Sequence, residues 1–180
     1  MKTKRILLVG LALMGLAFTL ANNWIVDSKK AQVEFIVNGP FGEVNGHFSG
    51  LRSTINFDEN NLSASTILAS VDVMTIETGN RLRNEHLREK AEWFNAAKYE
   101  QITIKSRQIR KTGEGYQLTA DLTIKGITKS VDIPFSFTLK DNSGEFKSQF
   151  KINREDFGVG NSGGGVGNVV TIRLDIPVSR

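Results

Sequence analysis

Hydrophobic and polar residues alternate along most of this chain, most clearly over residues 118–139. Apolar residues fall on even positions up to Ile124 and on odd positions from Ile127 onward. Alternation with a period of two indicates a β-strand with one buried face. A turn of two or four residues around Lys125-Gly126 keeps both apolar sets on the same side. The stretch therefore predicts an antiparallel hairpin with one buried and one solvated face.

Similar alternation before and after this hairpin predicts further strands. Its parity changes at Ser49-Gly50, which predicts a bulge or a sharp bend. Pro134 lies on the polar side of the second hairpin strand, and because proline has no N–H, that strand requires an edge or a bulge there. The other predicted strands cover residues 31–38, 44–57 with its bend, 65–73, 146–152 and 170–178, and one more starts at Ile102 and Ile104.

Residues 75–99 break the alternation and are rich in helix formers, with i,i+4 charge pairs at Arg81–Glu85 and Arg88–Glu92. We expect one or two short helices across one end of a sheet. About eight sequential strands lose their edges when they close into a barrel, and a barrel of this size can hold one small ligand. The predicted fold class is all-β, an antiparallel up-and-down barrel of about eight strands with a short helical insert. A two-sheet sandwich is the alternative.

The N-terminus carries a different pattern. Three basic residues precede an apolar run from Ile6 to Leu20, which is the length of a signal-peptide core and short for a membrane span. We expect cleavage after Ala21, which leaves a domain over residues 22–180 without a stable membrane span. An uncleaved anchor is the alternative. The predicted location is the periplasm or the outside of the cell.

This processing changes the charge balance. The whole chain has a net charge of +4, but removal of Lys2, Lys4 and Arg5 leaves 20 basic and 19 acidic residues, or +1. A balance near neutrality gives no support for nucleic-acid binding. The chain has no cysteine, which excludes disulfides, thiolate metal ligands and a thiol nucleophile.

Residues for catalysis are scarce. His47 lies on the predicted solvent face of a strand, and His86 lies among basic residues. Neither has neighbours at the spacing of a metal site, and the sequence has no nucleophile-elbow serine. Residues 158–163 match G-x-G-x-x-G, but a strand follows instead of the helix that a dinucleotide site requires. We therefore expect a rim loop there, and we predict no enzyme activity, no cofactor and no metal.

Two features could serve binding. The insert carries five basic residues within ten positions, which suit a phosphate or carboxylate, although three glutamates make an ordinary solvated helix face the alternative. The chain also has eleven phenylalanines, most of them on the inward side of predicted strands. Inward aromatic residues fit a packed core as well as the wall of a ligand cavity. The basic residues are Arg81, Arg83, His86, Arg88 and Lys90.

Several motifs along nearly the whole processed chain resemble, in their order, those of the YceI-like family of exported, lipocalin-like polyisoprenoid-binding proteins. The most recognisable run is 122–129, Leu-Thr-Ile-Lys-Gly-Ile-Thr-Lys. Departures from the family pattern are Asn84 for an acidic residue, Glu92 and Trp93 for Asp and Phe, and Glu100 for a proline. The other matching segments are Trp24-x-Val26-Asp27, Gly46-x-Phe48, residues 78–87, residues 92–94 and residues 152–158.

The resemblance implies an elongated apolar cavity that holds the chain of an isoprenoid or fatty lipid, with no enzyme activity and with a homodimer as one assembly. The expected partner is an amphiphilic lipid whose polar head lies near the mouth. Alternatives are an accessory role in redox or stress chemistry through a bound isoprenoid quinone, and an interaction module without a ligand. The expected cavity residues are Phe35, Phe48, Phe57, Ile67, Trp93, Phe94, Ile104, Phe135, Phe137 and Phe150, and the expected head-group residues are Asn80, Arg83, His86 and Arg154.

Overall fold

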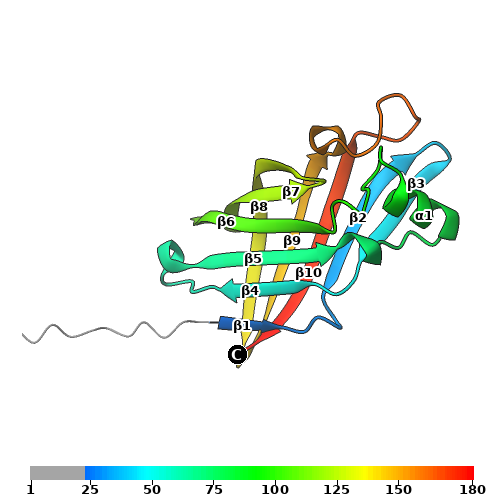
Figure 1. Cartoon of the computed structure of the whole chain (residues 1–180). Coiled ribbons are helices and arrows are strands. Elements are labelled where there is room, and N and C mark those ends of the chain that lie inside the picture. Colours follow the sequence, from blue (N-terminus) through cyan, green and yellow to red (C-terminus); the bar gives the residue numbers. More distant parts are fainter. Residues whose placement is uncertain (1–22) are drawn as a thin grey trace, which may run out of the picture.

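The computed structural model describes residues 23–180, so the predicted signal peptide lies outside the described residues. The described chain forms ten strands, one α-helix and three short 3-10 helices (Figure 1). The strands are β1 Asn23–Val26, β2 Gln32–Gly39, β3 Gly42–Phe48, β4 Arg52–Asn56, β5 Thr66–Asp72, β6 Gln101–Thr112, β7 Gly115–Ile124, β8 Ile127–Lys140, β9 Ser143–Asn153 and β10 Val169–Ser179. The helices are α1 Arg81–Glu89, η1 Leu62–Ala64, η2 Val73–Thr75 and η3 Arg154–Phe157.

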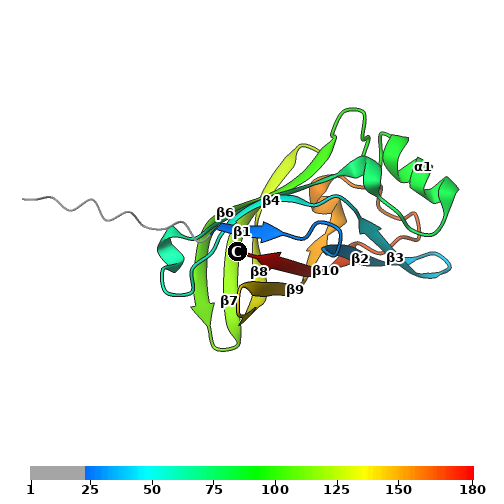
Figure 2. The same ribbon diagram turned by 90° about the horizontal axis from the view of Figure 1, so that it is seen from below.

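Eight of these strands close into an antiparallel barrel, as predicted, and the sandwich alternative is wrong. The hydrogen-bonded order runs from β1 through β4, β5, β6, β7, β8 and β9 to β10, and β10 pairs back with β1. One edge of β10 pairs with β9 along the whole strand. The other edge has two partners: its first half pairs with β2, and its end pairs with β1. The β2–β3 hairpin therefore extends the wall beyond one end of the barrel (Figure 2).

The predicted central hairpin is confirmed in its details. Ile124 pairs with Ile127 across the two residues Lys125 and Gly126, which have φ values of 51° and 76°. Two positive φ values define the type I′ turn, which matches the twist of paired strands. On the β9 side, β8 is paired only from Phe135 onward. Pro134 thus ends an unpaired edge, as its missing N–H requires.

The predicted parity change at Ser49-Gly50 is a sharp bend. β3 ends at Phe48, Gly50 has a φ of 68°, and β4 begins at Arg52 as a partner of β1 and β5. The alternating pattern predicted buried positions at both ends of β8, but Ile127 and Leu139 there are 41% and 46% exposed. β8 runs past the end of its partner β7 only at its C-terminal end, where Leu139 lies, whereas Ile127 pairs with Ile124 beside the turn.

Aromatic side chains close one end of the barrel. Phe57, which is 1% exposed, lies with its ring centroid 5.1 Å from those of Tyr116 and Phe137 and 5.3 Å from that of Phe146. The indole N–H of Trp24 donates to the carbonyl of Phe57 at 3.0 Å. Tyr116 donates to the Glu59 carboxylate, and burial together with that hydrogen bond raises the pKa of Tyr116 to about 12.

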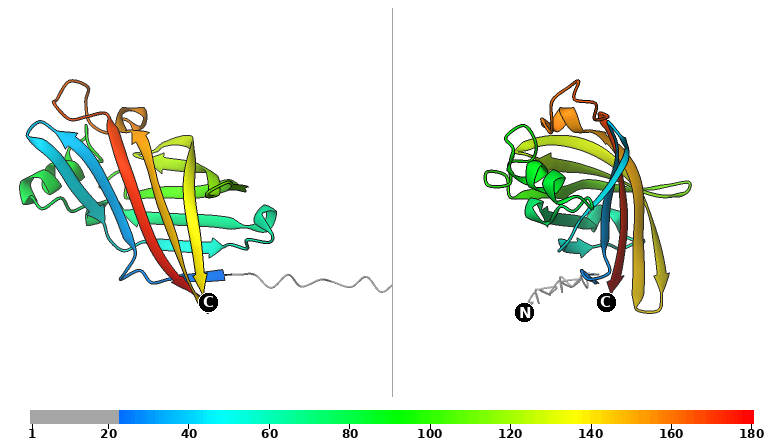
Figure 3. Two further views of the ribbon diagram at one scale, coloured as in Figure 1. Left: turned by 180° about the vertical axis from the view of Figure 1, so that it is seen from behind. Right: turned by 90° about the vertical axis from the view of Figure 1, so that its right-hand side faces the viewer.

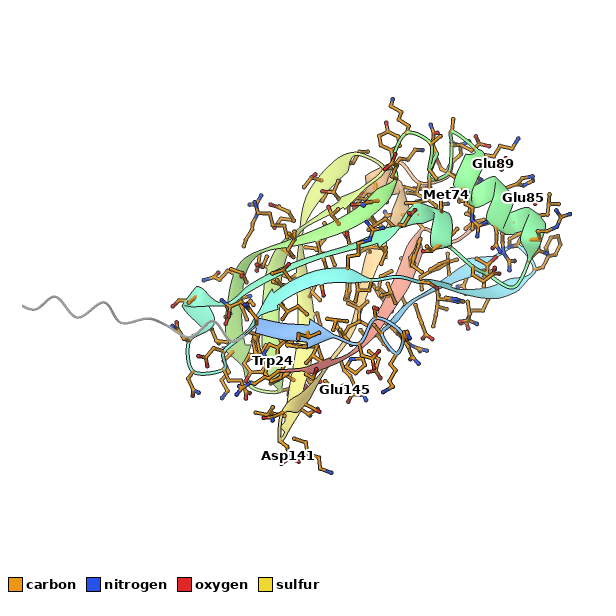
Figure 4. The ribbon with its side chains drawn as sticks, turned by 60° about the horizontal axis from the view of Figure 1, so that its bottom comes forward. Trp24, Met74, Glu85, Glu89, Asp141 and Glu145 are labelled. Carbon is orange, nitrogen blue, oxygen red and sulfur yellow. The ribbon has the colours of Figure 1, made fainter. Side chains whose placement is uncertain are left out.

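The opposite end is assembled from the β2–β3 hairpin, the insert that contains α1, the β7–β8 turn and the loop after β9 (Figure 3). α1 begins at its N-cap Asn80, whose side chain accepts from the N–H of Arg83 at 2.9 Å. Glu85 and Glu89 on α1 lie at this end, far from Trp24 (Figure 4). None of the helices in residues 23–180 is long and apolar enough to cross a membrane.

Candidate functional site

The barrel encloses an apolar inner chamber of about 170 Å³. Side chains from β2 to β10 point inward because each strand alternates between the two faces of the wall. The walls are almost wholly apolar, so the chamber favours hydrocarbon over water. Six residues expected in the cavity line this chamber, namely Phe35, Phe48, Ile67, Ile104, Phe135 and Phe150.

A larger mouth chamber of about 530 Å³ adjoins the inner one. Its walls come from the β2–β3 hairpin, from α1, from Trp93 and Phe94, and from the loop after η3. At its rim, Phe41 is fully exposed and Leu82 is 60% exposed. The two chambers lie next to each other, because they share six wall residues: Phe35, Phe48, Ile102, Ile124, Ile152 and Ile172.

The structure thus places eight of the ten expected apolar residues on the cavity walls. Phe57 and Phe137 were expected there as well, but they pack in the aromatic cluster at the closed end. Strand alternation gives the face of a side chain but not its depth along the barrel, and these two residues lie below the chamber. The sequence interpretation emphasised aromatic residues and missed the aliphatic wall residues Ile102, Ile124, Ile152 and Ile172, although their inward parity was readable.

Arg154 lies beside the mouth, but its guanidinium donates within the protein. The side chain is 4% exposed. Nε donates to the carbonyl of Gly167 at 3.0 Å, Nη1 to Val159 at 2.7 Å, and Nη2 to Val166 at 2.9 Å and Asn161 at 3.3 Å. Arg154 therefore organises the glycine-rich loop that forms one wall of the mouth.

Lys125 joins two other parts of the rim. Its Nζ donates to the carbonyl of Gly158 at 2.6 Å and to that of Glu92 at 3.1 Å. Burial lowers the pKa of Lys125. The N–H of Gly160 also donates to the Glu92 carbonyl, at 2.6 Å. The G-x-G-x-x-G segment is therefore a rim loop, as expected, and no helix follows it.

The remaining expected head-group residues gather on and before α1. The Arg83 guanidinium is half-buried and donates from Nε to the Thr78 hydroxyl at 2.8 Å and from Nη2 to the Thr78 carbonyl at 2.6 Å. Asn80 caps the helix, and His86 is exposed. All three line the mouth chamber. Within residues 23–180, no group of three or more His, Cys, Asp or Glu side chains could hold a metal ion.

Asn84 anchors this network, and its amide explains the departure from the acidic residue of the family pattern. The side chain is 4% exposed. Oδ1 accepts from the hydroxyl of Thr78 at 2.6 Å and from its N–H at 3.0 Å, while Nδ2 donates to Glu77 Oε1 at 2.7 Å. A carboxylate has no donor to offer Glu77. The Asn84 hydrogen bond is also the main cause of the lowered pKa of Glu77, together with the N–H of Gly79.

Replacing Asn84 with aspartate is expected to reverse the contribution of Glu77 to the pH dependence of the protein's stability. In the native protein the Glu77 pKa is lowered, so its contribution to folding is present at neutral pH and is lost as pH falls through that pKa. In Asn84→Asp two carboxylates face each other and their pKa values rise, so stability falls at neutral pH and recovers as pH falls. Thermal unfolding from about pH 7 down to pH 3 measures both slopes.

Asn45→Asp is the matched control for this experiment. Asn45 Nδ2 also donates to a glutamate, Glu43 Oε1 at 3.3 Å, but both side chains are exposed. Water screens that pair, so the control should change stability little at any pH. Equal pH profiles for native protein and Asn84→Asp would contradict the role given to the buried amide.

A closed antiparallel barrel with an apolar interior and a single built-up mouth is the architecture of lipocalin-like ligand-binding barrels. The model of the YceI-like domain matches residues 24–178, and the chain belongs to this family. A UPF0312 protein of Yersinia pestis (strain Pestoides F) is 30% identical over 155 residues, which cover 81% of this chain and 80% of that protein.

Solved structures share the fold. BcnA of Burkholderia cenocepacia is similar with a TM-score of 0.80 and 25% identity, over 85% of this chain and 99% of that one. A YCEI protein of Campylobacter jejuni has a TM-score of 0.67 and 20% identity, over 75% and 84% of the two chains. A polyisoprenoid binding domain from Saccharophagus degradans has a TM-score of 0.65 and 13% identity, over 88% and 98%.

Proposed function

We propose that this protein binds a long-chain amphiphilic lipid of the isoprenoid type and carries or sequesters it without chemical change. The observation that carries this proposal is the pair of adjoining chambers with largely apolar walls, closed at one end by aromatic side chains and open at the other. The polyisoprenoid binding domain from Saccharophagus degradans, which has the same fold, supports the choice of ligand class.

Burial of the hydrocarbon supplies the affinity. Each square ångström of apolar surface removed from water contributes roughly 25 cal/mol, so a long chain needs few polar contacts. The cavity would then select ligands by length and shape. With the N-terminal segment acting as an export signal, we place this activity in the periplasm.

Native mass spectrometry of the protein from its own host, purified without detergent, tests this function. We expect one discrete extra mass that organic solvent removes, because a chain buried in the cavity leaves slowly. The value of that mass identifies the lipid. A protein that carries only its own mass, under conditions in which a known lipid carrier retains its ligand, would contradict the proposal and favour an interaction module.

A further inference from the structure

Ser53 places a hydroxyl in the wall of the inner chamber. It lies on β4 in register with Ala69 of β5, between the inward-facing residues Leu51 and Ile55. Its Oγ is shielded from solvent and has no hydrogen-bond partner among residues 23–180. Its wall neighbours Leu51, Ile55 and Ala69 are aliphatic and offer it no hydrogen bond.

Other inward hydroxyls of the barrel are satisfied by the backbone of a neighbouring strand. Ser148 Oγ donates to the carbonyl of Pro134 at 2.6 Å. Ser106 Oγ accepts from the N–H of Ile67 at 2.9 Å. A buried hydroxyl without a partner is unfavourable, and a ligand that supplies the partner removes this penalty.

We propose that Ser53 Oγ hydrogen-bonds a hydroxyl or carbonyl oxygen of the bound lipid. The oxygenated end of the ligand then lies inside the barrel at the depth of Ser53, and the hydrocarbon chain extends toward the mouth. This inference rests on the proposed lipid-binding function, and it reverses the orientation expected from sequence, in which the polar head lay at the mouth.

The mouth supports this orientation. Arg154 donates to carbonyls of the loop, Arg83 donates to Thr78, and Asn80 accepts from the helix. The exposed rim residues Phe41 and Leu82 are apolar. Three of the four expected head-group residues are therefore engaged within the protein, and the fourth, His86, faces the mouth exposed.

Two probes with one carbon skeleton test the inference: phytol, an isoprenoid alcohol, and phytane, its hydrocarbon. The fluorescence of Trp93, which lines the mouth, reports binding of either probe. Ser53→Ala should weaken phytol binding about tenfold and leave phytane binding unchanged, because the lost hydrogen bond exists only with the alcohol. The free Ser53→Ala protein should melt no lower than the native protein, since the change removes an unsatisfied buried group.

Ser148→Ala is the control variant, because its hydroxyl already has a protein partner. It should leave the ratio of phytol to phytane affinity unchanged. If Ser53→Ala leaves that ratio unchanged as well, the contact is overturned. If Arg83→Gln lowers the ratio in place of Ser53→Ala, the polar head lies at the mouth and the proposed orientation is overturned. If neither probe binds the native protein, the proposed function fails, and the inference with it.

Discussion

Replacing Ala69 with tryptophan is expected to abolish lipid binding while the barrel stays folded. Ala69 is an inward-facing residue of β5, in register with Ser53 on one side and Ile104 on the other. It is among the smallest side chains on the wall of an inner chamber of about 170 Å³. A tryptophan at this position occupies that volume itself, so the ligand loses its deepest contacts.

The expected loss of affinity is at least about 100-fold, which corresponds to roughly 3 kcal/mol. Large side chains forced into a packed core usually destabilise it by about 1–3 kcal/mol, but an existing void reduces that strain. Titration with phytol measures the affinity, and thermal unfolding confirms that the variant is folded.

Leu68→Trp is the matched control for Ala69→Trp. Leu68 is the preceding residue of the same strand, but it faces outward and is 52% exposed. The same increase in size there should leave binding intact. A folded Ala69→Trp protein that binds phytol like the native one would place the ligand outside the inner chamber.

Replacing Arg154 with methionine is expected to cause the largest loss of stability among these changes. Methionine fills a similar space but donates no hydrogen bond, so the loop carbonyls that Arg154 holds lose their partner. Each buried carbonyl left without its donor costs about 1–3 kcal/mol, so we expect a total loss of about 3–5 kcal/mol. Urea unfolding measures this loss.

Hydrogen exchange tests whether the loss is local to the mouth. The N–H of Gly160 donates to Glu92, and that of Gly167 donates to Asn38, so these amides report the docking of the loop on both neighbours. Both should exchange faster in Arg154→Met. Arg173→Met, at an exposed arginine of β10 that bonds Gln149, is the control and should change stability by less than about 0.5 kcal/mol. Unchanged exchange in Arg154→Met would show that backbone hydrogen bonds alone hold the loop.

The barrel is closed at one end by residues from segments distant in sequence. Trp24 of β1, Phe57 after β4 and Phe137 of β8 meet there. The open end likewise depends on side chains that join separate segments, such as Lys125 between Glu92 and Gly158. Substitutions at either end are therefore expected to change binding through the shape of the cavity.

The sequence by itself determined the features that depend on local chemistry. Alternating apolar residues specified the strands and the face that each one buries. Lys125-Gly126 indicated a turn of two or four residues, Pro134 an edge or a bulge, and Ser49-Gly50 a bulge or a sharp bend. The helix formers after residue 75 specified the insert, and the ordered motifs indicated the family.

The tertiary structure decided depth and hydrogen-bond partners, because both depend on which distant segments meet. Phe35 and Phe57 look alike in sequence, yet one lines the cavity and the other closes its end. Arg154 looked like a head-group ligand, but the loop after it folds back and takes its donors. Ser53 looked unremarkable among wall residues until the closed barrel left its hydroxyl buried without a partner. An alternating pattern shows only whether a side chain faces the inside or the outside of the barrel. Its position along the barrel axis is set by the pairing of all the strands.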